Sequence, residues 1–247
     1  MSAILELIRS LRLSAEKSVG FRAVRWERHG LCDCADILRS GIDVRTVLDV
    51  GANVGGIARE YVRWFPNAIV HCFEPVPSTF ERLEANLGRH ARVRLHREAL
   101  GASPGRAMMF VGDNDLTNSL AHSRPGSQQI EVPVATLDEF ISRNSISRVE
   151  FLKVDAEGFD LEVLRGGSAA LADGRVSFVL VEVTPNLGID RHVHLDAVKT
   201  FLEPMGFRLY GLYDQVLAWD GRPMMQFANA LFRFQNSFLP EGCHLST

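Results

Sequence analysis

The stretch that decides the fold is residues 48–56, which read Leu-Asp-Val-Gly-Ala-Asn-Val-Gly-Gly. It follows a short β-branched run and opens a segment with helical periodicity. Gly51 allows the dihedral angles of a sharp turn, and the missing side chains at Gly51 and Gly55 let a ligand approach the backbone. The helix that follows adds unpaired N–H groups and the positive end of a dipole. The stretch therefore predicts a strand–turn–helix unit that binds a nucleotide-like ligand.

Two acids narrow the choice of ligand, because a glycine-rich turn alone fits NAD, FAD or S-adenosylmethionine. Asp49 lies where a carboxylate attracts an ammonium group and repels a pyrophosphate, and Asn53 replaces the second glycine of a dinucleotide fingerprint. Glu74 and Pro75 end the next strand, about 20 residues further on, where an acid accepts hydrogen bonds from ribose hydroxyls. The pattern favours S-adenosylmethionine. Its predicted contacts here are Asp49, Gly51, Asn53, Gly55, Glu74 and Pro75.

Short apolar strands alternate with helices along most of the chain, which is typical of an α/β fold with a mostly parallel sheet and helices on both faces. Ser78 is the expected N-cap of the helix at residues 78–87. Residues 106–135 break the rhythm and predict a β-hairpin-like insertion or a mobile loop. Late antiparallel strands are expected at 209–212, 216–219 and 230–234. We expect an N-terminal helical extension at residues 1–42 and the main domain at 43–247.

Bulk properties exclude several classes of protein. The chain has 247 residues, enough for one large α/β domain, and a net charge of −3, which argues against a nucleic-acid-binding protein. No apolar run reaches the roughly 20 residues that span a bilayer, and no signal peptide is recognisable. Four cysteines without a metal-binding or disulfide pattern fit a cytoplasmic protein. A homo-oligomer is left open.

Three ordered motifs strongly resemble those of FkbM-type S-adenosylmethionine-dependent methyltransferases. They are residues 47–55 (VLDVGANVG), 73–75 (FEP) and 154–166 (VDAEGFDLEVLRG). The resemblance spans residues 46–183 and implies the class I methyltransferase fold and methyl transfer, usually to oxygen. It also implies that Ala99 and Leu100 border the adenine and that Ser119 lies in a loop over the active site. The family does not fix the acceptor.

Acids gather at the predicted chemical edge of the sheet. Asp155 and Glu157 follow one strand, and Glu182 ends the next. Asp155 is a candidate general base and, with Glu157, a candidate cofactor contact. Alternatively, Asp155 and Glu182 bind a divalent cation such as Mg²⁺, which would acidify a hydroxyl. His192 and His194, in the following loop, are alternative general bases because imidazole titrates near neutrality.

The sequence thus predicts an S-adenosylmethionine-dependent O-methyltransferase, with or without assistance from a metal ion, that acts on a hydroxyl of a saccharide, an oligosaccharide or a polyketide-like small molecule. The aromatics Tyr210, Tyr213, Trp219 and Phe227 are expected mostly in the core, with one or two available to stack on a sugar ring. The alternatives are a non-catalytic protein that keeps the cofactor fold and an NAD-dependent oxidoreductase.

Overall fold

The computed structural model describes residues 40–111, 128–186, 192–218 and 224–235, together with Cys34, Ile37 and Leu38. Cys34 and Ile37 are fully buried and belong to the hydrophobic core. Residues 1–33, 35, 36 and 39 of the predicted N-terminal extension lie outside the described residues. None of the described helices is long and apolar enough to cross a membrane.

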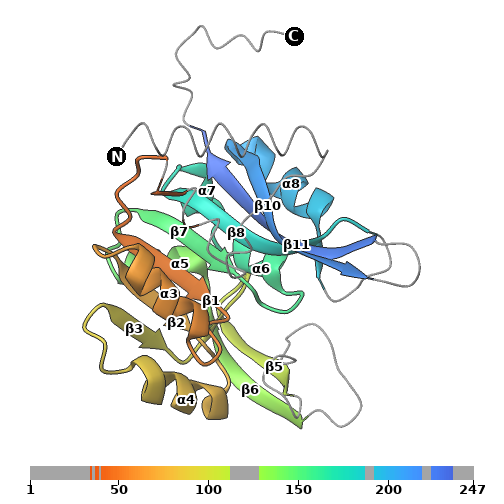
Figure 1. Cartoon of the computed structure of the whole chain (residues 1–247). Helices are drawn as coiled ribbons and strands as arrows, with labels where there is room; N and C mark the ends of the chain where they lie inside the picture. Colours follow the sequence, from red (N-terminus) through yellow and green to blue (C-terminus); the bar gives the residue numbers. More distant parts are fainter. Residues whose placement is uncertain are drawn as a thin grey trace, which may run out of the picture.

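A central sheet organises the protein (Figure 1). Its strand order is β10-β11-β8-β7-β1-β2-β3, with β9 paired to β8. β1, β2, β3, β7 and β8 run parallel, whereas β11 is antiparallel to both of its neighbours, β8 and β10. β7 is buried along its whole length and β8 along nearly all of it, as expected for central strands covered on both faces. The strands are β1 (Thr46–Val50), β2 (Ile69–Phe73), β3 (Val93–His96), β7 (Val149–Val154), β8 (Val176–Thr184), β9 (Val193–His194), β10 (Phe207–Ala218) and β11 (Met224–Phe234).

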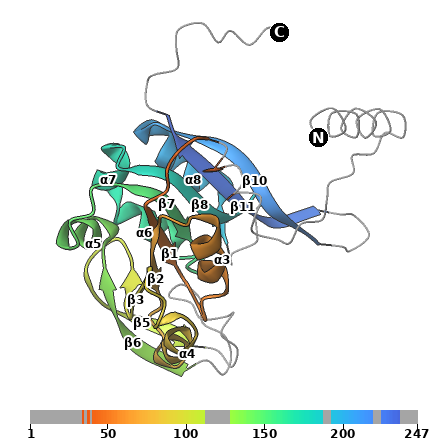
Figure 2. The same cartoon turned by 60° about the vertical axis from the view of Figure 1, so that its left-hand side comes forward.

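Helices cover both faces of this sheet, as predicted (Figure 2). One hydrophobic core lies under α3 (Gly56–Trp64) and α4 (Pro77–Leu87). The other lies under α5 (Leu137–Arg143), α6 (Asp160–Arg165), α7 (Ser168–Ala172) and α8 (Leu195–Leu202), which is followed by the short η2 (Glu203–Met205). The parallel strands therefore end at one edge between two helical layers, which is where α/β sheets bind ligands.

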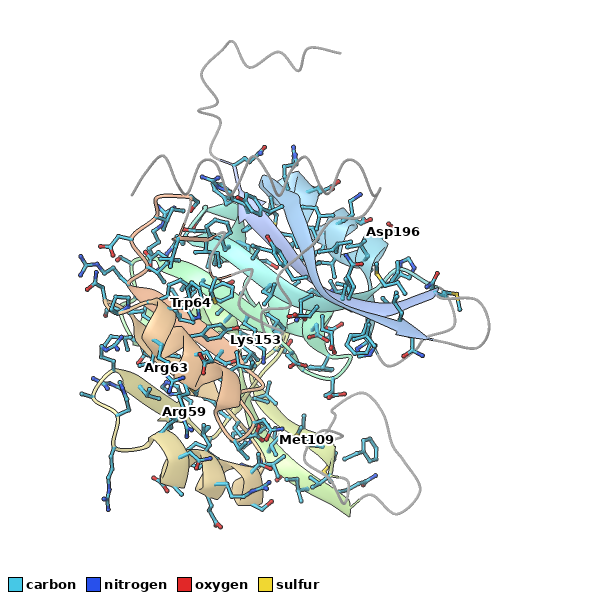
Figure 3. All side chains as sticks on the ribbon, viewed as in Figure 1. Arg59, Arg63, Trp64, Met109, Lys153 and Asp196 are labelled. Atoms are coloured by element: carbon cyan, nitrogen blue, oxygen red, sulfur yellow. The ribbon has the colours of Figure 1, made fainter. Side chains whose placement is uncertain are left out.

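A second sheet forms from the segment that broke the α/β rhythm. β5 (Gly105–Val111) and β6 (Gln128–Ala135) pair antiparallel, and β4 (Ala99–Leu100) pairs parallel with β6. A small core of Val76, Ala99, Met109 and Val132 joins this sheet to the chain that follows β2. The predicted hairpin is confirmed, and it brings Met109 towards the end of the central sheet (Figure 3).

Two local predictions are wrong. Ser78 does not cap α4; the N-cap is Val76 and Pro77 is the first helical residue, where its fixed φ angle suits a helix start. The strands expected at 209–212 and 216–219 form one strand as far as Ala218, β10, which contains register shifts rather than a turn. Trp219 lies outside the described residues. Bulges keep a strand continuous where its polar residues break the apolar pattern.

Candidate functional site

A cavity of about 330 Å³ lies where β1, β2 and β7 end. The turn after β1 forms one wall, Glu74 and Pro75 form a second, and the turn after β7 forms a third. Its lining residues are Val50, Gly51, Ala52, Asn53, Val54, Gly56, Ile57, Phe73, Glu74, Pro75, Glu98, Ala99, Leu100, Met109, Lys153, Asp155, Ala156 and Glu157.

The turn after β1 needs glycine at position 51. Gly51 has φ +73°, and a Cβ there would lie 1.9 Å from the carbonyl oxygen of Asp155. The backbone N–H groups of Gly51 and Ala52 both donate to the carbonyl of Phe73, at 3.1 and 3.0 Å. The turn is therefore pressed between the ends of β2 and β7, and any side chain at position 51 would push these strand ends apart.

Glu74 fixes the same turn to the end of β2. One carboxylate oxygen accepts the backbone N–H of Asn53 at 3.1 Å, and the other accepts the N–H of Val76 at 2.9 Å. Asn53 itself has φ +50°, a conformation that asparagine tolerates better than most residues. Each carboxylate oxygen can accept more than one hydrogen bond, so Glu74 can organise the turn and still meet a hydroxyl in the cavity.

Asp160, which the sequence analysis assigned no role, holds the turn after β7. Its two carboxylate oxygens accept the backbone N–H groups of Ala156 at 2.9 Å and of Gly158 at 3.1 Å. Burial raises the pKa of Asp160 to about 7, although these two hydrogen bonds favour the ionised form. Glu157 lies inside this turn with φ +49°. Asp160 thus shapes the backbone that brings Asp155 and Glu157 to the cavity.

Lys153, also missed from the sequence, forms an ion group beneath the site. Its Nζ lies 3.2 Å from Oδ1 of Asp49 and 3.2 Å from Oδ2 of Asp155, and donates to the carbonyl of Gly51 at 3.1 Å. Asp49 is fully buried and is absent from the cavity lining. Burial raises the pKa of Asp49, against the lowering effect of Lys153. Burial would lower the pKa of Lys153, but Asp155 and Asp49 together raise it above its ordinary value.

The strand register explains this group. Asp49 and Lys153 are paired residues of adjacent parallel strands, so their side chains leave the sheet on the same face. Asp155 is two residues beyond Lys153 and returns to that face. The carboxylate of Asp49, which was predicted to hold a ligand ammonium group, is therefore turned towards Lys153, and Lys153 links it to Asp155 at the cavity wall.

A second cavity, of about 400 Å³, adjoins the first on the face covered by α3. Ile57, Lys153 and Asp155 line both cavities. Asp155 and Glu182 were predicted to lie close together at adjacent strand ends, and both line this second cavity. Its other lining residues are Tyr61, Val154, Leu180, Asp214, Val216, Phe227 and Asn229.

The two candidate histidines differ in their surroundings. Nδ1 of His192 lies 2.8 Å from Oε2 of Glu182, and the His192 ring packs against the ring of Phe227, with centroids 4.5 Å apart. His192 thus contacts two residues that line the second cavity. Nδ1 of His194 instead accepts the backbone N–H of Asp196 at 3.2 Å and caps α8. His194 lines neither cavity.

The other predicted site residues are placed as follows. Gly51, Asn53, Glu74, Pro75, Ala99, Leu100, Asp155 and Glu157 all line the first cavity. Gly55 is the N-cap of α3, with φ +84°, and a Cβ there would meet Leu83 and Leu87. Ser119 lies outside the described residues. No group of three or more His, Cys, Asp or Glu side chains that could hold a metal is found in the described part of the chain.

The first cavity fits S-adenosylmethionine by its chemistry. Glu74 faces it as an acceptor for ribose hydroxyls, and Ala99, Leu100 and Met109 give it an apolar side for a base. Among the described lining residues, the remaining acids, Glu98, Asp155 and Glu157, outnumber the cation of Lys153. Such a lining suits a sulfonium ligand better than an anionic pyrophosphate.

The central sheet is parallel except for β11, which runs antiparallel between β8 and β10, and the first cavity lies beside the end of β1. Together these features define a class I S-adenosylmethionine-dependent methyltransferase. Residues 49–209 match the model of the Methyltransferase FkbM domain. The protein belongs to this family, which confirms the resemblance seen in the sequence.

Three relatives of this chain are named as methyltransferases. Methyltransferase 1 of Beauveria bassiana is 27% identical over 183 residues, covering 65% of this chain and 71% of the relative. The 2-O-methyltransferase NoeI of Sinorhizobium fredii is 28% identical over 172 residues, covering 63% and 70%. The hexuronic acid methyltransferase AglP of Haloferax volcanii is 33% identical over 143 residues, covering 58% and 56%.

Proposed function

We propose that the protein transfers a methyl group from S-adenosylmethionine to a hydroxyl oxygen of a saccharide or a polyketide-like small molecule. The observation that carries this proposal is the wall of Ile57, Lys153 and Asp155 shared by the two cavities. A cofactor in the first cavity and an acceptor in the second would meet at this wall. Holding two reactants in one orientation supplies much of the acceleration of such a displacement. The names of two relatives, the 2-O-methyltransferase NoeI and the hexuronic acid methyltransferase AglP, support an oxygen acceptor and a sugar-like acceptor.

We propose roles for several of the predicted contacts at the first cavity. Bound S-adenosylmethionine supplies an electrophilic methyl group. Glu74 accepts ribose hydroxyls, and Ala99 and Leu100 contact the base. Asn53 and Glu157 take the amino-acid end of the cofactor. Asp49 acts on the site indirectly, because Lys153 forms ion pairs with both Asp49 and Asp155.

The second cavity offers one arrangement for removing the hydroxyl proton. Glu182 accepts from Nδ1 of His192, which fixes the tautomer and leaves Nε2 as the basic nitrogen. Asp155, held by Lys153, orients the hydroxyl at the shared wall. His192→Gln should therefore lower kcat and shift the pH profile, with little change in the Kd for S-adenosylmethionine.

A metal-assisted reaction at Asp155 and Glu182 is the second candidate, because both acids line the same cavity. Each already has a cationic or proton-donating neighbour, Lys153 for Asp155 and His192 for Glu182. Turnover should therefore survive EDTA. Loss of turnover with EDTA and its return with Mg²⁺ would favour the metal.

The proposed function is tested by calorimetry and mass spectrometry. Wild-type protein should bind S-adenosylmethionine, and Glu74→Ala should weaken binding by roughly tenfold or more, because a buried hydrogen bond to a charged group contributes about 1.5–3 kcal/mol. Incubation with neutral glycosides should give products one methyl group heavier. Binding without methyl transfer to any hydroxyl compound would leave the non-catalytic alternative.

A further inference from the structure

Among the described residues that line the second cavity, negatively charged side chains outnumber positively charged ones. They are the carboxylates of Asp155, Glu182 and Asp214, against the cation of Lys153. Lys153 lies 3.2 Å from both Asp155 and the fully buried Asp49. Its charge is therefore already matched within the protein, so the cavity keeps an excess of negative charge for any ligand that enters it.

The rest of this cavity suits a ring with many hydroxyls. Tyr61, Leu180, Val216 and Phe227 give it apolar and aromatic surface. The amide of Asn229 donates to Oδ2 of Asp214 at 3.0 Å, so these two side chains form one polar edge. Carboxylate oxygens accept hydroxyl hydrogens, and an aromatic face packs against the C–H face of a sugar.

We propose that this cavity is an acceptor site that selects neutral polyhydroxylated molecules and rejects acceptors carrying a carboxylate near the methylated hydroxyl. The proposal rests on the proposed function and adds the charge class of the substrate. It separates this protein from its relative named as a hexuronic acid methyltransferase. At an effective dielectric constant of about 20, repulsion between like charges roughly 7 Å apart would weaken the binding of a charged acceptor by a factor of about 50 relative to a neutral one.

Asp214 is the residue through which this selection is best tested. It lies on β10 and lines the second cavity but not the first. Its φ is +48°, a conformation that asparagine also adopts readily. Asp214→Asn therefore removes one negative charge while keeping the shape of the side chain and an oxygen that can accept from Asn229.

The experiment uses pairs of acceptors that differ at one carbon. Methyl α-glycopyranosides with gluco, galacto and manno configuration are compared with the matching uronates and with their neutral uronamides, using S-adenosylmethionine labelled in its methyl group. We expect kcat/KM for the neutral glycoside to exceed that for the uronate by at least about tenfold. The uronamide matches the uronate in size but is neutral, so its kcat/KM should approach that of the glycoside. In Asp214→Asn, kcat/KM for the uronate should rise several-fold relative to kcat/KM for the glycoside.

Asp173→Asn is the control, because it makes the same charge change at the exposed C-cap of α7, outside both cavities. Asp173→Asn should leave the ratio of kcat/KM between uronate and glycoside unchanged. Equal use of uronate and glycoside by the wild type would overturn the charge inference and leave the proposed function standing. Transfer to no glycoside, uronate or uronamide, with S-adenosylmethionine still bound, would instead overturn the saccharide function. The wild-type comparison decides the matter even if Asp214→Asn folds poorly.

Discussion

Replacement of Asp160 by alanine should damage both stability and cofactor binding, and the structure offers a matched control. Asp160 accepts two backbone N–H groups of the turn after β7, from Ala156 and Gly158. Asp138 accepts two backbone N–H groups at the start of α7, from Ala169 and Ala170, at 3.0 and 2.9 Å. Asp138 lines neither cavity, so the two substitutions remove the same kind of bonds in different places.

The expected loss of stability follows from these bonds. An N–H group left without an acceptor costs about 1–3 kcal/mol when it is buried. Ala156 and Gly158 are half-buried, so we expect a total loss of about 2–3 kcal/mol for Asp160→Ala, from the lower part of that range. Asp138→Ala should lose about 1–2 kcal/mol, because Ala169 is more exposed.

The effect on binding should separate the two variants. Without Asp160 the turn is free to move Asp155 and Glu157 away from the first cavity. Urea unfolding measures stability, and calorimetry measures the Kd for S-adenosylmethionine. We expect Asp160→Ala to raise this Kd at least about tenfold, since 1.4 kcal/mol is a factor of ten, while Asp138→Ala leaves it unchanged. The reasoning fails if both variants bind the cofactor equally well after equal losses of stability.

Three further predictions concern the strand ends and the core. Gly51→Ala and Gly41→Ala both place a side chain at a positive φ, of +73° and +79°, but only the first meets a neighbouring backbone. Thermal unfolding should therefore show that Gly41→Ala lowers the free energy of unfolding by about 1 kcal/mol and that Gly51→Ala lowers it clearly more. Gly51→Ala should also lose cofactor binding. Equal losses of stability in the two variants would count against the clash at position 51. Lys153→Met should lower the free energy of unfolding by about 3–5 kcal/mol, and a second change of Asp49 to Asn should recover part of it, because the single variant leaves a buried charge unpaired; no recovery would argue against the ion group. His71 and His96 are half-buried and stack on each other, with ring centroids 5.3 Å apart, and burial is the main cause that lowers the pKa of each to about 4. As the pH falls, these imidazoles are protonated in the unfolded chain at a higher pH than in the folded protein. The free energy of unfolding should therefore fall between about pH 6.5 and pH 4, by about 2 kcal/mol after allowance for the partial exposure of the two rings. Chemical unfolding of wild type and His96→Phe across that range would show the smaller slope in the variant, and identical slopes would refute the assignment.

Much of the fold could be predicted because its signals are local. Val176–Thr184 reads as a mostly apolar run, interrupted at Ser177 and Glu182, which is typical of a strand buried on both faces. The polar segment between β5 and β6 marked the hairpin. Glycine at positions 51 and 55 marked the turn and the start of α3.

The cofactor wall could be predicted for a related reason. Strand C-termini meet at one edge of a parallel sheet, so Glu74 and Asp155 had to approach the glycine turn. The local sequence pattern misplaced the start of one helix, α4. Ser78 resembles an N-cap, yet Pro77 begins the helix one residue earlier.

Lys153 and Asp160 escaped prediction because their roles depend on partners that no periodicity specifies. The pairing of Lys153 with Asp49 needs the register between β1 and β7. The role of Asp160 needs the backbone path of a turn with two residues at positive φ, Glu157 and Gly158. His194 was plausible as a base from its position in the chain, but that position is also where α8 starts, and its ring caps the helix.

The antiparallel pair of β10 and β11 has a consequence for how the protein can change. The family model ends at residue 209, near the start of β10, whereas Asp214, Val216, Phe227 and Asn229 lie beyond it. The wall that faces the cofactor thus comes from the shared part of the family, and much of the opposite wall comes from a hairpin outside it. Exchange of that hairpin between relatives would graft one acceptor preference onto an unaltered methyl donor site, so new substrates could arise here without the first cavity being rebuilt.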